Sequence, residues 1–177
     1  MQVVFYEHMP SPIGRLLLVS DGDALTGLYM SDHNGGPLPE PGWKRDQASL
    51  AAVREQLEAY FAGRLQQFEF GLNPAGTPFQ RRVWMELRRI PFGETISYGE
   101  LARRTGQPTA SRAVGRANGQ NPIAIVVPCH RVIGADGTLT GFGGGIERKR
   151  WLLEHEAAAG GRGVVPESVD AASCAVS

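Results

Sequence analysis

A cysteine followed directly by a histidine is the feature of this 177-residue chain with the clearest chemical potential. Cys129 and His130 lie within Pro128–Arg131, at the end of the apolar run Ile123–Val127. A thiol becomes a nucleophile when a nearby base or positive charge favours the thiolate. The pair therefore predicts nucleophilic chemistry. A lone cysteine after an apolar run can equally be a core residue, because cysteine is among the most buried residue types.

The apolar run before Cys129 is the element that must position the thiol. Four of the five residues of Ile123–Val127 are β-branched, and such a run predicts a buried strand. Pro128 has no N–H to donate to a sheet, so the strand is expected to end there. The thiol would then lie where a strand stops.

Two short helices joined by a tight turn are predicted before this strand. Ser97 and Glu100 have the spacing of a capping box, which opens the first helix, and Gly106 ends it. The second helix is expected over residues 110–119. Such a pair predicts a helix-turn-helix that binds DNA. Helix pairs of this kind also occur as plain packing units, and the pattern alone leaves both interpretations open.

The second helix is rich in small residues and carries two arginines. Gly115 and Gly119 each lower helix stability by about 1 kcal/mol relative to alanine. Close approach of the helix backbone to a nucleic-acid groove, or to a neighbouring helix, would explain that cost. Arg112 and Arg116 are four residues apart and so share one face of the helix.

The charge of the chain is unevenly distributed although its net value is zero. Residues 80–151 have a net charge of +7, whereas residues 1–79 have −4 and residues 152–177 have −3. A basic middle segment predicts contact with phosphates. Arginines that simply coat solvated helices are the alternative.

The chain is predicted to form two domains and a tail. Residues 1–75 are expected to form an α/β domain, a small antiparallel sheet with one helix that starts near Asp46. Residues 76–159 are expected to form a mainly α domain whose first helix is capped by Thr77, with Pro78 at its first position. Residues 160–177 lack periodicity and are predicted to be a disordered tail, which includes Cys174.

Composition points to a soluble globular protein in a reducing compartment. The chain is 42% apolar and 20% charged, as is usual for that class. No run reaches the roughly 20 apolar residues of a membrane span, and the N-terminus lacks the pattern of a signal peptide. A disulfide between the two cysteines would consume the proposed nucleophile, so a cytoplasmic location without membrane attachment is expected.

Longer blocks of the chain resemble the O6-alkylguanine-DNA alkyltransferases, the methylated-DNA–protein-cysteine methyltransferases. Within residues 77–156 the similar blocks are Phe79–Trp84, Ile90–Thr95, Ser97–Ala102, Ser111–Gly115, Asn118–Pro122, Ile125–Gly134 and Gly141–Gly145. Ser11–Gly14 is also similar to the family. The resemblance implies a ribonuclease H-like N-terminal domain and a C-terminal catalytic domain with a winged-helix-like helix-turn-helix.

The resemblance also implies a mechanism and a role for each site residue. Cys129 would attack the alkyl carbon on O6 of a guanine flipped out of duplex DNA, with His130 as base through a water and Glu156 orienting the histidine. Asn121 would brace the turn before the active site, and Tyr98 would protonate the departing guanine. Asn121 as a plain turn residue and Tyr98 as a core aromatic are the structural alternatives.

The resemblance further implies DNA-contacting and pocket residues. The second helix would enter the minor groove, with Arg112 filling the gap left by the flipped base; the contacting set is Ser111, Arg112, Ala113, Gly115 and Arg116. The expected pocket residues are Val132, Phe142, Gly143 and Gly144. Many eukaryotic relatives carry Tyr and Ser where this chain has Phe142 and Gly143, which leaves the width of the pocket open.

No cofactor is expected, and the predicted partner is double-stranded DNA with alkylated guanine, bound by a monomer. A thioether on Cys129 has no evident route back to thiol, so a single-turnover reaction is predicted, with O4-alkylthymine as an open second substrate. A zinc site from Cys129, His130 and His155 lacks four ligands at the usual spacing. A non-catalytic lesion sensor, a helix-turn-helix regulator and a cysteine hydrolase are the competing functions.

Overall fold

The computed structural model describes residues 2–30, 38–142 and 144–160. The predicted pocket residue Gly143, Cys174 and the predicted tail from 161 onward lie outside the described residues. Contacts between Cα atoms divide the chain into two compact units. Unit 1 comprises 1–75 with 122–124, and unit 2 comprises 76–121 with 125–177.

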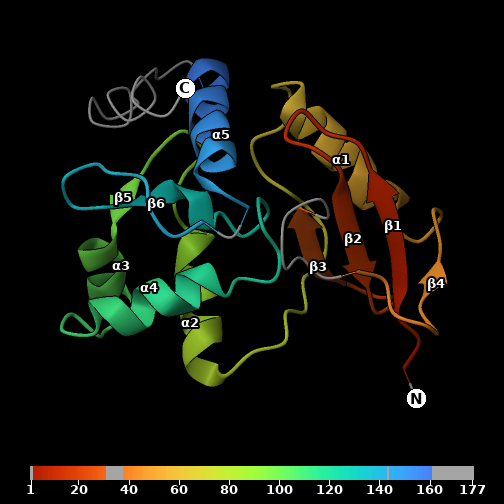
Figure 1. Ribbon diagram of the computed structural model, residues 1–177, viewed down its shortest axis with the longest axis horizontal. Helices are drawn as coiled ribbons and strands as arrows, with labels where there is room; N and C mark the ends of the chain where they lie inside the picture. The colour runs from red at the N-terminus through yellow and green to blue at the C-terminus, as the bar shows by residue number, and fades with distance from the viewer. Residues whose placement is uncertain (1, 31–37, 143, 161–177) are drawn as a thin grey trace. The chain divides into compact units, whose positions relative to one another are not determined.

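Unit 1 is built on a four-stranded sheet (Figure 1) with the order β3-β2-β1-β4. The strands are β1 (Phe5–Met9), β2 (Leu16–Ser20), β3 (Leu25–Met30) and β4 (Lys44–Arg45). β1, β2 and β3 pair antiparallel, as expected, but β4 pairs parallel to β1. The sheet is therefore mixed and not purely antiparallel, because β4 adds to the edge of β1 that β2 leaves open and runs in the same direction as β1.

The core of unit 1 lies between this sheet and α1 (Ala51–Phe61). All five residues of β2 are buried, and α1 contributes Val53, Leu57 and Tyr60 to the interior. The helical spacing of these apolar positions is the pattern that predicts an amphipathic helix packed on a sheet. The α/β character expected for residues 1–75 is confirmed.

Unit 2 is mainly helical. Its elements in chain order are α2 (Pro78–Leu87), β5 (Ile96–Ser97), α3 (Tyr98–Arg104), α4 (Ser111–Gly119), the 3-10 turn η1 (Cys129–Arg131), β6 (Val132–Ile133) and α5 (Ile146–Ala159). Thr77 caps α2 in a reciprocal capping box with Gln80, which satisfies two otherwise unpaired N–H groups. Trp84 of α2 donates from Nε1 to the carbonyl of Ala117 at 2.9 Å and so fixes α4 beside α2.

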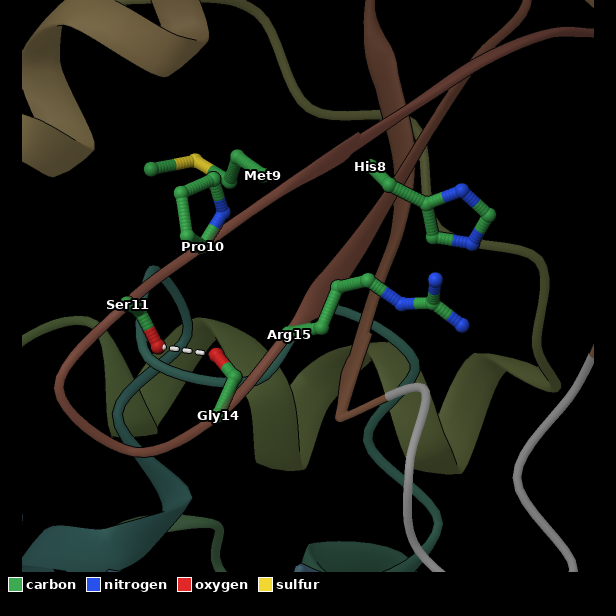
Figure 2. Close-up of a pocket in the computed structure, with 6 residues that line it drawn as sticks. All are labelled: His8, Met9, Pro10, Ser11, Gly14 and Arg15. Carbon is green, nitrogen blue, oxygen red and sulfur yellow. Dashed lines mark hydrogen bonds between the residues drawn. The ribbon is translucent and has the colours of Figure 1, made fainter.

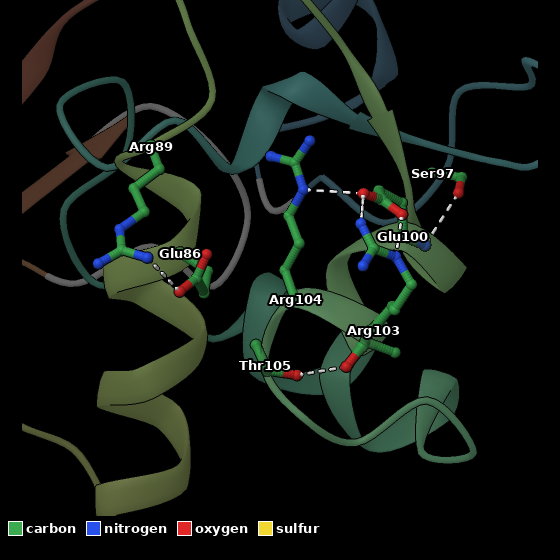
Figure 3. Close-up of polar contacts among 8 residues, drawn as sticks. Glu86, Arg89, Ser97, Glu100, Arg103, Arg104 and Thr105 are labelled. Carbon is green, nitrogen blue, oxygen red and sulfur yellow. Dashed lines mark hydrogen bonds and ion pairs between the residues drawn. The ribbon is translucent and has the colours of Figure 1, made fainter.

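The start of α3 differs from the expected capping box. The Ser97 hydroxyl accepts the N–H of Glu100, as predicted. The Glu100 carboxylate, however, accepts hydrogen bonds from Arg103 and Arg104, both on the same helix (Figure 3). Two cations one turn away compete more strongly for a carboxylate than a single backbone N–H does.

The expected strand over Ile123–Val127 is wrong. Only Ile123 pairs with a strand, as an isolated bridge to Leu28, and the residues after it form turns. Ile125 has a φ of +72°, a conformation that is costly for a β-branched residue and incompatible with a strand. The predicted burial is correct, since all five residues are buried. The thiol therefore follows a strained, buried turn.

Candidate active site

Cys129, His130 and Glu156 come together within unit 2. Cys129 and His130 are the first two residues of η1, and Glu156 lies in the third turn of α5. Nε2 of His130 lies 2.7 Å from Oε2 of Glu156. His130 and Glu156 are completely buried, and Cys129 is 7% exposed. The three residues that the sequence singled out thus form one buried group.

Arg131 completes this group, although sequence reasoning gave it no role. Its Nε donates to Oε1 of Glu156 at 2.8 Å and one terminal nitrogen donates to Oε2 at 3.0 Å. The other terminal nitrogen donates to the carbonyl of Ile90 at 2.7 Å, and the guanidinium lies over the ring of Phe92. A two-point bond of this kind fixes the carboxylate in one orientation.

The charges of this group assign the proton on His130. Burial would raise the pKa of Glu156, but His130 and Arg131 outweigh it and hold that pKa well below its usual range. Burial lowers the pKa of His130, with Glu156 acting in the opposite direction. A neutral imidazole beside an ionised carboxylate must donate from Nε2. Nδ1 is then the unprotonated nitrogen, and among the described residues it has no hydrogen-bond partner.

The surroundings of the Cys129 thiol shift its pKa in opposite directions. Burial raises the pKa of the thiol, whereas a side-chain hydrogen bond with Asn121 and the charge of Lys149 act in the opposite direction. Lys149 is itself fully buried, and burial lowers the pKa of its amine to about 8. The thiol is thus desolvated but lies near groups that stabilise a developing negative charge.

Asn121 and Asn118 hold the turn that carries Cys129. Nδ2 of Asn121 donates to the carbonyl of Val127 at 2.7 Å. Nδ2 of Asn118, on the buried face of α4, lies 3.4 Å from the carbonyl of Cys129. Both asparagines thus contact the segment around Cys129. The bracing role of Asn121 stays a prediction, and Asn118 was not assigned from the sequence.

Tyr98 and Lys149 meet at one carbonyl oxygen. The hydroxyl of Tyr98 donates to the carbonyl of Thr140 at 3.0 Å, and Nζ of Lys149 donates to the same oxygen at 2.7 Å. The Lys149 ammonium lies 5.8 Å from the centre of the Tyr98 ring. Burial raises the pKa of Tyr98, so its hydroxyl stays protonated at neutral pH. Lys149 is not among the site residues that the sequence analysis assigned.

The solvent-facing side of α4 carries the predicted DNA-contacting residues. Val114, Ala117 and Asn118 are buried, while the exposed positions are Ser111, Arg112, Ala113 and Arg116, with Gly115 partly exposed. Within the described part of the chain neither Arg112 nor Arg116 has an ion-pair partner. Two cations on a face of small side chains are available to an anionic surface.

The two helix glycines are not explained by packing inside unit 2. A Cβ on Gly115 would meet the Tyr98 ring at 3.5 Å, and one on Gly119 would meet the carbonyl of Gly141 at 3.9 Å. Both are ordinary van der Waals distances, so alanine would fit. The tight contact between helices is therefore not observed at these positions, and close approach of an external surface remains the expectation.

The predicted pocket residues lie on the two segments after Cys129. Val132 is fully buried in β6, while Phe142 and Gly144 are half-buried. The Gly144 carbonyl accepts a hydrogen bond from Arg148 at 2.8 Å. A separate cavity of about 340 Å³ lies at the β1–β2 connection of unit 1 (Figure 2), lined by His8, Met9, Pro10, Ser11, Gly14 and Arg15. It includes none of the predicted pocket residues.

Groups of three or more metal-ligating side chains do not occur among the described residues. Of the three residues weighed as zinc ligands, His155 stacks instead on Trp151, with ring centres 4.8 Å apart, and His130 uses Nε2 for Glu156. None of the described helices is long and apolar enough to cross a membrane.

Comparison with known proteins gives matches along most of the chain. Residues 4–74 match the 6-O-methylguanine DNA methyltransferase ribonuclease-like domain, and residues 78–158 match the DNA binding domain of the same family. The chain is 53% identical over 154 residues to the methylated-DNA–protein-cysteine methyltransferase of Mycobacterium tuberculosis, covering 87% of this chain and 93% of that protein. The Haemophilus influenzae protein of the same name is 47% identical over 159 residues, covering 88% of each.

Solved structures give the same result. The O6-methylguanine methyltransferase of Mycobacterium tuberculosis has a TM-score of 0.81 at 52% identity, covering 89% of this chain and 94% of that one. The crystal structure of Mycobacterium tuberculosis OGT in complex with DNA has a TM-score of 0.82 at 52% identity, and the match covers 88% of this chain and 94% of that one. These matches confirm the predicted fold class of both domains. The chain belongs to the 6-O-methylguanine DNA methyltransferase family, the methylated-DNA–protein-cysteine methyltransferases.

Proposed function

We propose that this protein repairs DNA by moving the alkyl group from O6 of an alkylated guanine to Sγ of Cys129. The observation that carries the proposal is the buried group of Cys129, His130 and Glu156, closed by Arg131. It combines a nucleophile, a neutral base and a fixed carboxylate, which is the arrangement that activates a thiol. Family membership supplies the class of reaction.

The transfer is a single displacement at the alkyl carbon. The Sγ–C bond forms while the C–O6 bond breaks, and the electron pair of that bond leaves on O6 of guanine. The thiol proton passes to Nδ1 of His130, directly or through a water. The resulting imidazolium keeps the proton on Nε2 and donates it in a hydrogen bond to Glu156, whose negative charge stabilises the imidazolium.

The departing guanine anion needs a proton, and Tyr98 is the proposed donor; the tyrosinate left behind then takes up a proton, which balances the one that the thiol gave to His130. Its hydroxyl donates to the Thr140 carbonyl in this structure, so that bond must be exchanged for one to the base. Lys149 donates to the same carbonyl and keeps it satisfied when Tyr98 turns away. The buried ammonium then also faces the negative charge that develops during transfer.

The product is an S-alkylcysteine, which no described group of the protein can cleave. Breaking a thioether requires a strong nucleophile or a reductant, and neither the buried histidine nor the carboxylate is one. Each protein molecule therefore acts once. The reaction consumes the protein in proportion to the lesions it repairs.

The DNA-binding part of the proposal concerns α4. Its exposed side chains are small apart from Arg112 and Arg116, so the helix backbone can approach the floor of a narrow minor groove. O6 of guanine in an intact duplex cannot reach a thiol as buried as Cys129. The base must therefore be extruded, with Arg112 taking its place in the stack. One such surface per chain is consistent with action as a monomer.

A titration with intact-mass detection tests this proposal. A fixed amount of protein is incubated with increasing amounts of a duplex that contains O6-methylguanine. Repair should stop at one lesion per protein chain, and each chain should gain one methyl group. Binding without a mass change would favour a lesion sensor or a regulator, and repeated product release would favour a hydrolase. A parallel duplex with O4-methylthymine defines the range of substrates.

A further inference from the structure

The exposed face of α2 carries an arginine stripe that the proposed chemistry does not use. The stripe consists of Arg81 and Arg82 within the helix and Arg88 and Arg89 directly after its last residue, all exposed, with exposed Met85 between the two pairs. The opposite face of α2 buries Val83, Trp84 and Leu87 against the rest of unit 2. The four guanidinium groups therefore project from one side of the helix.

The stripe is poorly neutralised compared with the basic surfaces of α1 and α3. On α3, Arg103 and Arg104 share the carboxylate of Glu100, and on α1, Arg54 pairs with Glu58. Of the four stripe arginines, only Arg89 has an acidic partner among the described residues, Glu86 at 3.0 Å (Figure 3). That pair is on the surface, where an ion pair is easily exchanged for another anion.

Helix stability accounts for Arg88 and Arg89, at the C-terminal end of α2, but not for the positions of Arg81 and Arg82. Cations are favourable near the C-terminal end of a helix and unfavourable near its N-terminal end. Arg81 and Arg82 are the fourth and fifth residues of α2, so they lie toward the unfavourable end. Nε of Arg81 donates to the Gly76 carbonyl at 3.1 Å, and Arg82 lies 5.9 Å from the centre of the Phe79 ring. These contacts hold both side chains in place, and further guanidinium N–H groups of each arginine remain available to bind a ligand.

The spacing of the stripe fits duplex DNA. Arg81 and Arg88 are seven residues apart, and Arg88 keeps helical backbone angles directly after α2, so about 10.5 Å of helical rise separates them. Arg82 and Arg89 have the same spacing in the sequence. The major groove of B-DNA is about 12 Å wide. A helix that spans this groove could place one arginine pair on each of the two phosphate ridges that border it. The Trp84–Ala117 and Gln80–Gln120 hydrogen bonds hold α2 directly beside α4.

We propose that the arginine stripe of α2 binds the phosphates of the duplex that flanks the lesion, across the major groove next to the minor groove that α4 enters. This inference rests on the proposed function for the placement of α4. It adds a second DNA contact that carries no sequence information, because phosphate contacts set position and affinity only. The stripe would hold the protein on DNA while α4 inspects the bases.

The test uses a double variant of the full chain that combines Arg82→Ala with Arg88→Ala. The matched control is Arg64→Ala, which removes an exposed arginine of unit 1 outside the stripe. Binding is measured over a range of salt concentrations on duplexes of about one and about two helical turns, roughly 10 and 20 base pairs. The logarithm of the binding constant falls linearly with the logarithm of the salt concentration, with a slope of about −0.9 for each phosphate that the protein neutralises. On the longer duplex the double variant should lose two such contacts, so the magnitude of this slope should fall by about 1.8. The shorter duplex and the control variant should show little change.

Transfer from the free base O6-benzylguanine separates this inference from the proposed function. If the double variant reacts with the free base at the wild-type rate, its chemical centre is intact and its binding defect belongs to the stripe. Failure of the wild-type protein itself to react would count against the proposed function, whereas the binding data would still report on the stripe. An unchanged salt slope on the longer duplex, or equal reductions on both duplexes, would overturn the inference.

Discussion

Replacing Glu156 with glutamine should destabilise the protein strongly, because the carboxylate is the centre of a buried charged network. Glu156 is fully buried and accepts hydrogen bonds from His130, twice from Arg131 and from the N–H of Gly93. An amide keeps the shape but removes the charge, which leaves the Arg131 guanidinium buried without a counter-charge. Breaking a buried pair in this way costs about 3–5 kcal/mol. For a chain of this size, that corresponds to a fall in Tm of about 6–20 °C.

Glu100→Gln is the matched control for this experiment. Glu100 also accepts hydrogen bonds from two arginines, but it lies on the surface, where ion pairs contribute little. Thermal unfolding should show a large fall in Tm for Glu156→Gln and a small fall in Tm for Glu100→Gln. Similar falls in the two variants, or a fall of less than about 2 °C for Glu156→Gln, would refute the reasoning from burial.

The effect of Glu156→Gln should also depend on pH. The folded protein holds the pKa of Glu156 below its ordinary value of 4.5. The stabilisation by this carboxylate is therefore fully present above about pH 4.5 and is lost as the pH falls toward the lower folded-state value. The difference in stability between wild type and variant should shrink in that acidic range. A difference that stays constant as the pH is lowered through that range would indicate that the charge of Glu156 is not its cause.

Three further predictions concern the reaction. Arg112→Ala should slow repair in duplex DNA far more than transfer from free O6-benzylguanine, since base extrusion costs a few kcal/mol; equal slowing would make Arg112 a general phosphate contact. Lys149→Met should raise the pKa of Cys129 and move the single-turnover pH–rate profile to higher pH, and an unmoved profile would contradict this. The predicted pocket residues Phe142 and Gly143 stand where many eukaryotic relatives carry Tyr and Ser, so benzyl and methyl lesions should react at single-turnover rates within about tenfold of each other, or about 1.4 kcal/mol of barrier; complete rejection of the benzyl lesion would show that other residues set the width of the pocket.

Local signals in the sequence were enough to predict the starts of α2 and α3 and the extent of α4. Thr77 and Pro78 form the start of α2 as expected, and Ser97 caps α3. These features depend on residues within one turn of one another, so tertiary contacts do not need to be known. The small residues and arginines of α4 lie on its exposed face for the same reason, because helical periodicity alone determines which residues share a face.

Long-range contacts decided the features that the sequence did not reveal. The run before Cys129 has the composition of a strand, but its backbone turns at Ile125 after a single bridge to Leu28. Charged residues are rarely buried, so neither Arg131 nor Lys149 was assigned to the active site. Both are buried because a partner outside their own helical turn is present: Glu156 on α5 for the arginine, and the Thr140 carbonyl in the loop before α5 for the lysine.

The most direct test of the proposed function is to locate the transferred group on the protein. Wild-type protein and Cys129→Ser are each incubated with one equivalent of a duplex that contains O6-methylguanine, digested and mapped by mass spectrometry. We expect one methyl group on Cys129 of the wild type and none on the variant, which should still bind the duplex. A methyl group on Cys174, or methylation of the Cys129→Ser variant, would contradict the assignment of Cys129 as the nucleophile.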